Sequence, residues 1–247
     1  MSGRRARLAL AAAAVIALLV GAILLNLARS APPPPPERPA AERPELMLLT
    51  TLPIVFAEQL TLDAPPSPAL DALQSRYRVV PISVAAASEL ARRKLLLMAQ
   101  PQAQPAEALV ELDAWVRGGG RVLLLADPML EWPSERPLGD LLRPPSAFAD
   151  TGLIGHWGLR LEAPDAVGPT SIDVEGRELR TVSAGRLVVT GPSCTTVARG
   201  RIARCRIGKG EAVVVADADF LNLKSVAGAR GDANLGVLLE ELARLEQ

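Results

Sequence analysis

The sequence predicts an α/β fold: a doubly wound, mostly parallel sheet with an antiparallel β insertion, preceded by one transmembrane helix. Three observations support this. Apolar runs of strand length alternate with helical patterns as far as residue 127. Short β-like runs separated by turns then fill residues 165–207, before a last apolar strand and a leucine-rich helix. A long uncharged run also lies close to the first residue.

The first residues predict a membrane anchor. Three arginines within the first seven positions precede an uncharged run that begins at Leu8 and ends at Ala28. A helix of that length crosses about 30 Å of hydrocarbon. Basic residues on the short leading side favour a cytoplasmic N-terminus, so the rest of the chain is expected in the periplasm, tethered by one pass of the bacterial inner membrane. A cleaved signal peptide is the alternative, because small residues suited to cleavage occur at 28–30.

Composition divides the chain into an anchor (1–30), a linker (31–44) and a folded domain (45–247). Residues 32–36 are five consecutive prolines, which favour an extended polyproline helix. We expect this linker to hold the domain off the membrane.

The first half of the domain reads as alternating strands and helices. Ser67 and Pro68 are a helix cap and a first helical residue. Glycines at 118–120 stop a later helix, and the run from Val122 to Ala126 contains no polar residue, which indicates a strand covered on both faces. The expected strands are 46–52, 77–82, 94–100 and 122–126, and the expected helices begin at 67, lie within 83–93 and span 105–116.

The second half of the domain has a different residue pattern. A proline-rich loop at 129–145 leads to a short expected helix at 147–157 and a strand at 158–161. The β insertion, about 165–207, follows. Residues 211–216 again form a continuous apolar strand, and leucines recur with helical spacing over 232–245.

Two cysteines lie in the insertion. If the chain turns at Arg199 and Gly200, Cys194 and Cys205 stand opposite each other on paired strands, within disulfide reach. An oxidising compartment would preserve the bond. The alternatives are two buried thiols or, less favoured, a metal pair. Zinc needs more ligands, and the chain has a single histidine, His156.

Carboxylates follow two of the apolar strands. Asp127 ends one, and Asp217 and Asp219 end the other, so the three are expected at one edge of the sheet. With Gln100 and Asn222, these side chains are the candidate ligand-binding residues. Acids in such positions also cap turns by accepting backbone N–H groups, and that interpretation is favoured over ligand contact and over catalysis.

Several functions are not supported by the sequence. Basic and acidic residues number 27 each, so the composition gives no nucleic-acid footprint. No strand ends in a nucleophile elbow, no phosphate-binding loop is present, and the glycines at 118–120 precede a strand. We therefore expect no cofactor, no metal and no catalytic residue. Arg199, Arg201, Arg204, Arg206 and Lys209 form a basic run that could touch acidic headgroups or a partner, although a solvated face is favoured.

Two segments resemble a known family. Residues 95–101 with 112–128, and residues 208–221 followed by Asn234, are similar to the extracytoplasmic domain of the uncharacterised ABC-type transport system and gliding-motility ABC auxiliary family. The similarity covers about 45–127 and 208–245. The resemblance implies a flavodoxin-like or class I glutamine amidotransferase-like sheet without the catalytic residues.

The expected function is accordingly a membrane-anchored periplasmic binding or scaffold domain. The resemblance implies that it accompanies an ABC-type transport or envelope complex and is not an enzyme. The alternative is a divergent hydrolase that uses the carboxylates at the sheet's carboxyl edge.

Overall fold

The structure is a computed structural model of the chain and describes residues 35–56, 58, 67–222 and 231–247. The expected anchor at residues 8–28 lies outside the described residues. Within the described ranges, no helix is both long enough and apolar enough to cross a membrane.

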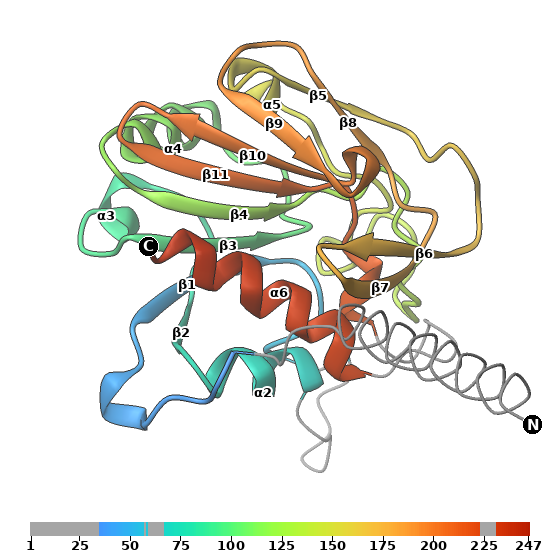
Figure 1. Ribbon diagram of the computed structural model, residues 1–247, viewed down its shortest axis with the longest axis horizontal. Helices are drawn as coiled ribbons and strands as arrows, with labels where there is room; N and C mark the ends of the chain where they lie inside the picture. Colours follow the sequence, from blue (N-terminus) through green and yellow to red (C-terminus); the bar gives the residue numbers. More distant parts are fainter. Residues whose placement is uncertain (1–34, 57, 59–66, 223–230) are drawn as a thin grey trace, which may run out of the picture.

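A seven-stranded, mostly parallel sheet forms the centre of this α/β domain (Figure 1). Its order is β2-β1-β3-β4-β11-β10-β9. The first five strands in that order pair in parallel, whereas β10 pairs antiparallel with both of its neighbours, β11 and β9. The bounds are β1 (Glu45–Thr50), β2 (Arg78–Pro81), β3 (Leu95–Ala99), β4 (Arg121–Leu125), β9 (Cys194–Val197), β10 (Ile202–Ile207) and β11 (Gly210–Val215).

Helices cover both faces of this sheet, as Figure 1 shows. One face packs against α2 (Pro68–Gln74) and α6 (Gly231–Leu245). The other packs against α3 (Ala87–Leu90), α4 (Ala106–Arg117) and α5 (Leu153–His156). Successive strand side chains alternate between the two cores: Leu97 and Leu123 belong to the first, Leu96 and Leu124 to the second. This explains why these strands carry no polar residue in their interiors.

The residues expected as one antiparallel insertion pair in three separate places. β6 (Pro169–Val174) and β7 (Arg177–Val182) form a hairpin, and β5 (Leu159–Glu162) pairs with β8 (Arg186–Val189). β9 and β10 instead extend the central sheet beyond β11. The reason is local: a tight turn after Ile207 brings the chain straight back as β11, so β10 pairs with it without a crossover.

The described end of the linker packs onto the domain. Arg38 donates its backbone N–H to Ser75 O at 2.9 Å, and its guanidinium pairs with Glu246 at 2.6 Å. Arg76 donates to Pro36 O. A short 3₁₀ turn, η1 (Ala40–Glu42), then leads into β1. The chain therefore enters the domain beside the ends of α2 and α6, where the parallel strands begin.

Candidate functional site

The three acids expected at one sheet edge do lie together. β4 and β11 are neighbours, with Leu125 opposite Val215, so Asp127 and Asp217 leave the sheet at the same level. Asp219 follows at the start of the turn η3 (Asp219–Leu221). All three side chains are fully buried. The sequence thus placed the acids correctly, but they do not face an open cleft.

The Asp127 carboxylate accepts hydrogen bonds from nearby backbone N–H groups. One carboxylate oxygen accepts the N–H of Met129 at 2.8 Å, and the other accepts the N–H of Ala218 at 2.9 Å. Burial raises the pKa of Asp127 to about 6, although these backbone N–H groups oppose the shift. The side chain connects the turn after β4 to the turn after β11.

Asp217 and Asp219 are held in a similar way. Asp217 accepts the N–H of Phe220 at 3.1 Å and the hydroxyl of Thr181. Burial, and then the charge of Asp127, raise the pKa of Asp217 well above its ordinary value. Asp219 accepts the N–H of Glu131 at 2.8 Å, while its other oxygen has no partner among the described residues. Burial raises the pKa of Asp219 to about 7.

Gln100 and Asn222 flank these acids. Gln100, with a left-handed φ of 44°, accepts the N–H of Asp127 at 2.9 Å and donates to Asp127 O at 3.2 Å and Pro145 O at 3.1 Å. Its amide therefore continues the strand pairing past the end of β3. Asn222, at the end of η3, donates its backbone N–H to Asp219 O at 2.8 Å.

This geometry favours the capping interpretation of the acids. Paired catalytic carboxylates need access to substrate, whereas Asp127 and Asp217 are enclosed and accept hydrogen bonds from the chain itself. Within the described ranges, no three acidic, histidine or cysteine side chains are grouped so as to hold a metal ion.

An open cleft lies elsewhere on the same edge. The strand order reverses between β1 and β3, and in open α/β sheets ligands bind at such a reversal. Here a cleft of about 550 Å³ opens between the ends of β1, β2 and β3 and the loop around residues 136–144. That volume is within the range of small-molecule sites. Its polar lining residues are Thr50, Thr51, Glu58, Ser83, Gln102, Gln104 and Arg136.

The charges of the cleft are paired. The Arg136 guanidinium lies 3.7 Å from a Glu58 carboxylate oxygen and donates to Glu58 O at 3.1 Å. Thr50 donates to Ala99 O at 2.8 Å, and Gln104 accepts the N–H of Ala85 at 3.0 Å. The cleft therefore presents an apolar surface with a neutral polar rim.

Three large apolar side chains stand at the mouth of this cleft. Phe56, Leu141 and Leu142 line it and are 73%, 81% and 67% exposed. Exposed apolar side chains grouped beside a cleft are typical of an interaction site. Sequence reasoning missed these residues, because the strand order that places them together is not readable from one sequence. The prolines of the 129–145 loop were the only available signal.

His156 lies apart from both sites. Its ring nitrogen is 3.6 Å from Asp113, which also accepts the indole N–H of Trp157 at 2.9 Å. His156 is not among the residues that line the cleft. It therefore serves neither the buried acids nor the cleft as a base.

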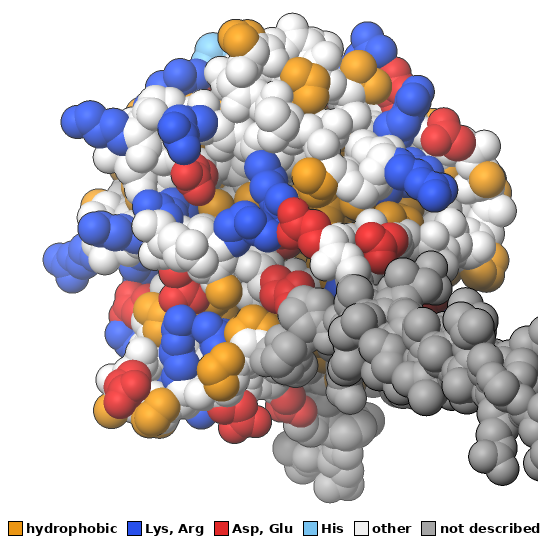
Figure 2. Space-filling view, viewed as in Figure 1, with side chains coloured by type: hydrophobic (Ala, Val, Ile, Leu, Met, Phe, Trp, Pro, Cys, Tyr) orange, Lys and Arg blue, Asp and Glu red, His pale blue; other side chains and the backbone are white. Residues whose placement is uncertain are grey.

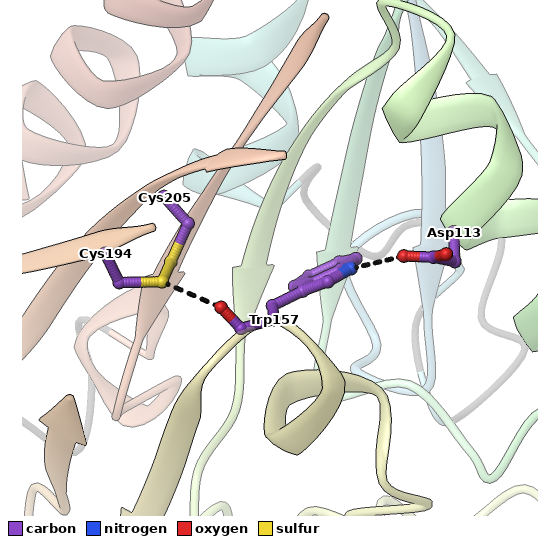
Figure 3. The surroundings of a disulfide bond; sticks show 4 residues. All are labelled: Asp113, Trp157, Cys194 and Cys205. Carbon is purple, nitrogen blue, oxygen red and sulfur yellow. Dashed lines mark hydrogen bonds between the residues drawn. A yellow bond between two sulfur atoms is a disulfide. The ribbon is translucent and has the colours of Figure 1, made fainter. Parts of the chain in front are cut away.

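Cys194 and Cys205 form a disulfide in the structure, shown in Figure 3. They face each other across β9 and β10. The next pair is hydrogen-bonded, since Arg206 N donates to Ser193 O, so the cysteines occupy the closer, non-hydrogen-bonded kind of pair. Sγ of Cys194 also lies 3.2 Å from Trp157 O, a contact only, because a disulfide sulfur has no proton to donate.

Comparisons with known proteins show similarity of fold alone. No family model matches the chain, and no curated protein matches it in sequence. Among solved structures, the N-terminal domain of mmIFT52 has a TM-score of 0.54 at 14% identity, covering 81% of this chain and 97% of that domain. At this identity, the likeness shows a shared fold alone.

Two glycosidases contain a part that is similar in fold to this chain. Exo-β-1,4-mannosidase Op5Man5 from Opitutaceae bacterium strain TAV5 has a TM-score of 0.50 at 14% identity, over 81% of this chain and 36% of that one. Gan42B, a GH42 β-galactosidase from G. stearothermophilus, has a TM-score of 0.50 at 14% identity, over 85% and 30%. The chain thus spans about a third of the length of each glycosidase.

Proposed function

We propose that this protein is a membrane-anchored periplasmic binding or scaffold domain that serves an ABC-type transport or envelope complex without catalysing a reaction. The proposal rests on the difference between the buried acids and the open cleft, which both lie at the carboxyl edge of the sheet. The buried acids are occupied by the chain's own N–H groups, while the open cleft is apolar and charge-neutral.

The strand order supports the finer fold assignment. The parallel strands follow the order 2-1-3-4 and then β11, which is the flavodoxin-like arrangement if β11 is counted as the fifth strand. An amidotransferase-like sheet without nucleophile and base agrees with the enclosed acids. The ABC-auxiliary family remains our proposal, based on the similarity of residues 95–128 and 208–221.

The disulfide supports the proposed compartment. A bond between Cys194 and Cys205 persists in an oxidising environment such as the periplasm. A single pass through residues 8–28, with the N-terminus in the cytoplasm, would place the domain there.

Co-purification of cleft variants tests this function. The full chain is extracted from membranes in mild detergent as wild type and as Leu141→Glu/Leu142→Glu, which puts two charges at the cleft mouth. We expect the wild type to retain a multi-spanning transporter subunit and the double variant to lose it. Val110→Glu is the matched control, since Val110 is 70% exposed on α4, away from the cleft. Equal recovery from all three proteins would refute the role of the cleft.

The divergent hydrolase makes the opposite prediction. It would require the buried acids to meet substrate, so Asp127→Asn would abolish turnover while leaving the transporter subunit bound. No contact of Asp127 within the described residues favours this alternative.

A further inference from the structure

The opposite edge of the sheet, where the parallel strands begin, carries a cluster of cations. We call this cluster the amino-edge cations: Arg92, Lys94, Arg206 and Lys209. Arg92 and Lys94 lie in the segment between α3 and β3, Arg206 lies on β10, and Lys209 lies in the turn between β10 and β11. Figure 2 shows Lys and Arg side chains gathered on this flank of the molecule.

Hydrogen bonds and strand register bring these cations together. Lys94 O accepts the N–H of Arg121, the first residue of β4, at 2.9 Å. Arg121 stands beside Glu211 on β11, which pairs in turn with Arg206. Since neighbouring strands are about 4.8 Å apart, Lys94 and Arg206 lie roughly three strand spacings from each other. Lys209 joins the same surface, because its N–H donates to Arg117 O at 3.0 Å.

The amino-edge cations are exposed and carry a net positive charge. All four side chains are exposed, and none has an ion-pair partner within the described residues. Nearby Arg117 is paired with Asp113 at 2.7 Å. Glu211, half-buried, is the acid set between Arg121 and Arg206. On a chain with no net charge, this edge is therefore locally basic.

The tether reaches the domain at the same edge. Arg38 binds Ser75 O and Glu246, and the preceding α6 residue Leu245 accepts a hydrogen bond from Arg121 at its carbonyl oxygen. Pro35, the first described residue, is seven residues beyond Ala28. By chain geometry these residues span at most about 25 Å. The basic edge is thus held within reach of the surface in which residues 8–28 are proposed to sit.

We propose that the amino edge docks on the anionic phospholipid headgroups of the anchoring membrane. This inference rests on the proposed anchoring. The positive charge of the amino-edge cations attracts negatively charged headgroups. The short tether keeps these cations close to the membrane. Docking leaves the cleft at the carboxyl edge turned away from the bilayer, free to receive a periplasmic part of a partner.

Amide hydrogen exchange on the full chain tests the docking. The chain is reconstituted into vesicles of phosphatidylcholine alone, or of phosphatidylcholine with about 30% phosphatidylglycerol. We expect the amides of residues 92–94, 117–121 and 206–210 to exchange more slowly in the anionic vesicles. Raising the salt to about 0.5 M should remove the difference, because the interaction is screened.

Charge-removal variants supply the matched comparison. Lys94→Gln/Arg206→Gln/Lys209→Gln should lose the slowing, since three cations shift the ratio of docked to free domain by about 100-fold. Arg160→Gln/Arg186→Gln/Arg199→Gln removes the same charge from β5, β8 and the turn between β9 and β10, and should keep it. Equal exchange of the wild type in both kinds of vesicle would overturn the docking. So would slower exchange that persists in the Lys94→Gln/Arg206→Gln/Lys209→Gln variant, or slower exchange at residues 136–144 in place of the amino edge.

A carbonate wash separates this proposal from the proposed anchor. A chain that resists the wash in both kinds of vesicle but shows no slowing is anchored and does not dock. A chain that leaves neutral vesicles, yet floats with anionic ones through its amino-edge cations, docks without an anchor.

Discussion

The Asp127 carboxylate accepts the backbone N–H of Ala218 at 2.9 Å, and this bond joins the turn after β4 to the turn after β11. Its second oxygen accepts the N–H of Met129 at 2.8 Å. Asp127, a candidate ligand-binding residue in the sequence, therefore accepts hydrogen bonds from backbone N–H groups at its own edge of the sheet. The adjoining cleft is left as the accessible part of that edge.

Truncating this acid should destabilise the fold. Asp127→Ala leaves the buried N–H of Ala218 and the partly buried N–H of Met129 without their acceptor, and a buried N–H left unpaired costs about 1–3 kcal/mol. We expect the free energy of unfolding to fall by about 2–4 kcal/mol, measured by urea denaturation of the full chain in detergent. The measurement is made at pH 5, where Asp127 is mostly protonated and the loss of a buried charge does not offset the effect.

Glu107→Ala is the control for that substitution. Glu107 is exposed on α4, and its removal should change the stability by less than about 0.5 kcal/mol. An Asp127→Ala protein as stable as the wild type, or more stable, would mean that the acid is kept for binding or chemistry.

Stability should decline as the pH rises from about 4 to about 7, between the unfolded and folded pKa values of two buried acids. The folded pKa values of Asp127 (about 6) and Asp219 (about 7) lie above the ordinary value of 3.8. A raised folded pKa contributes stability that is fully present below the unfolded value and is lost as the pH passes the folded value. Asp217 is shifted in the same direction. Asp113 and Glu175, whose pKa values are lowered, act below about pH 4, outside this window.

Asp219→Asn identifies the source of that decline. The amide can still accept the N–H of Glu131 but cannot ionise. Thermal unfolding across the pH range should show a flatter curve for this variant, with a gain on the order of 2 kcal/mol over wild type at pH 8. Parallel curves for the two proteins would exclude Asp219 as the titrating group.

Reducing the disulfide should weaken the antiparallel edge of the sheet. The bond closes a loop between residues 11 positions apart, and a loop of that size is worth about 2–3 kcal/mol. Denaturation with and without reductant should show this loss in the wild type. The Cys194→Ala/Cys205→Ala protein should not respond to reductant. Free thiols trapped in intact cells would speak against the periplasmic location.

Two neighbouring glycines should differ sharply in their tolerance of alanine. A Cβ at Gly120 would lie 2.3 Å from the Trp115 ring, whereas one at Gly118 would meet only carbonyl oxygens at 3.4 Å. We expect Gly120→Ala to cost more than about 2 kcal/mol and Gly118→Ala less than about 1 kcal/mol, by urea denaturation. Equal costs would mean that the Trp115 ring moves aside freely.

The strands buried on both faces were the part of the fold most readable from the sequence. β3, β4 and β11 were predicted because their side chains enter two cores and none can be polar. The leucine stripe of α6 was equally clear. The helix expected at 147–157 shortens to the four residues of α5, because its apolar spacing did not reveal the left-handed Gly152 that precedes it.

Long-range pairing could not be read from local pattern. Nothing in the β9 and β10 segments distinguishes a strand that extends the central sheet from one in a separate insertion, since both alternate in the same way. The candidate acids were located correctly for a local reason, as each ends an apolar run. The cleft was missed because Phe56 and Leu142 meet only through strand order.

Site-specific photocrosslinking from the cleft is a direct test of whether the cleft binds a partner. A photoreactive residue is placed in living cells at Leu142, at the cleft mouth, and separately at Val110, which is about equally exposed on α4. We expect an adduct with a transporter or envelope subunit from position 142 and none from position 110. Adducts of equal yield from both positions, or from position 110 alone, would contradict this expectation.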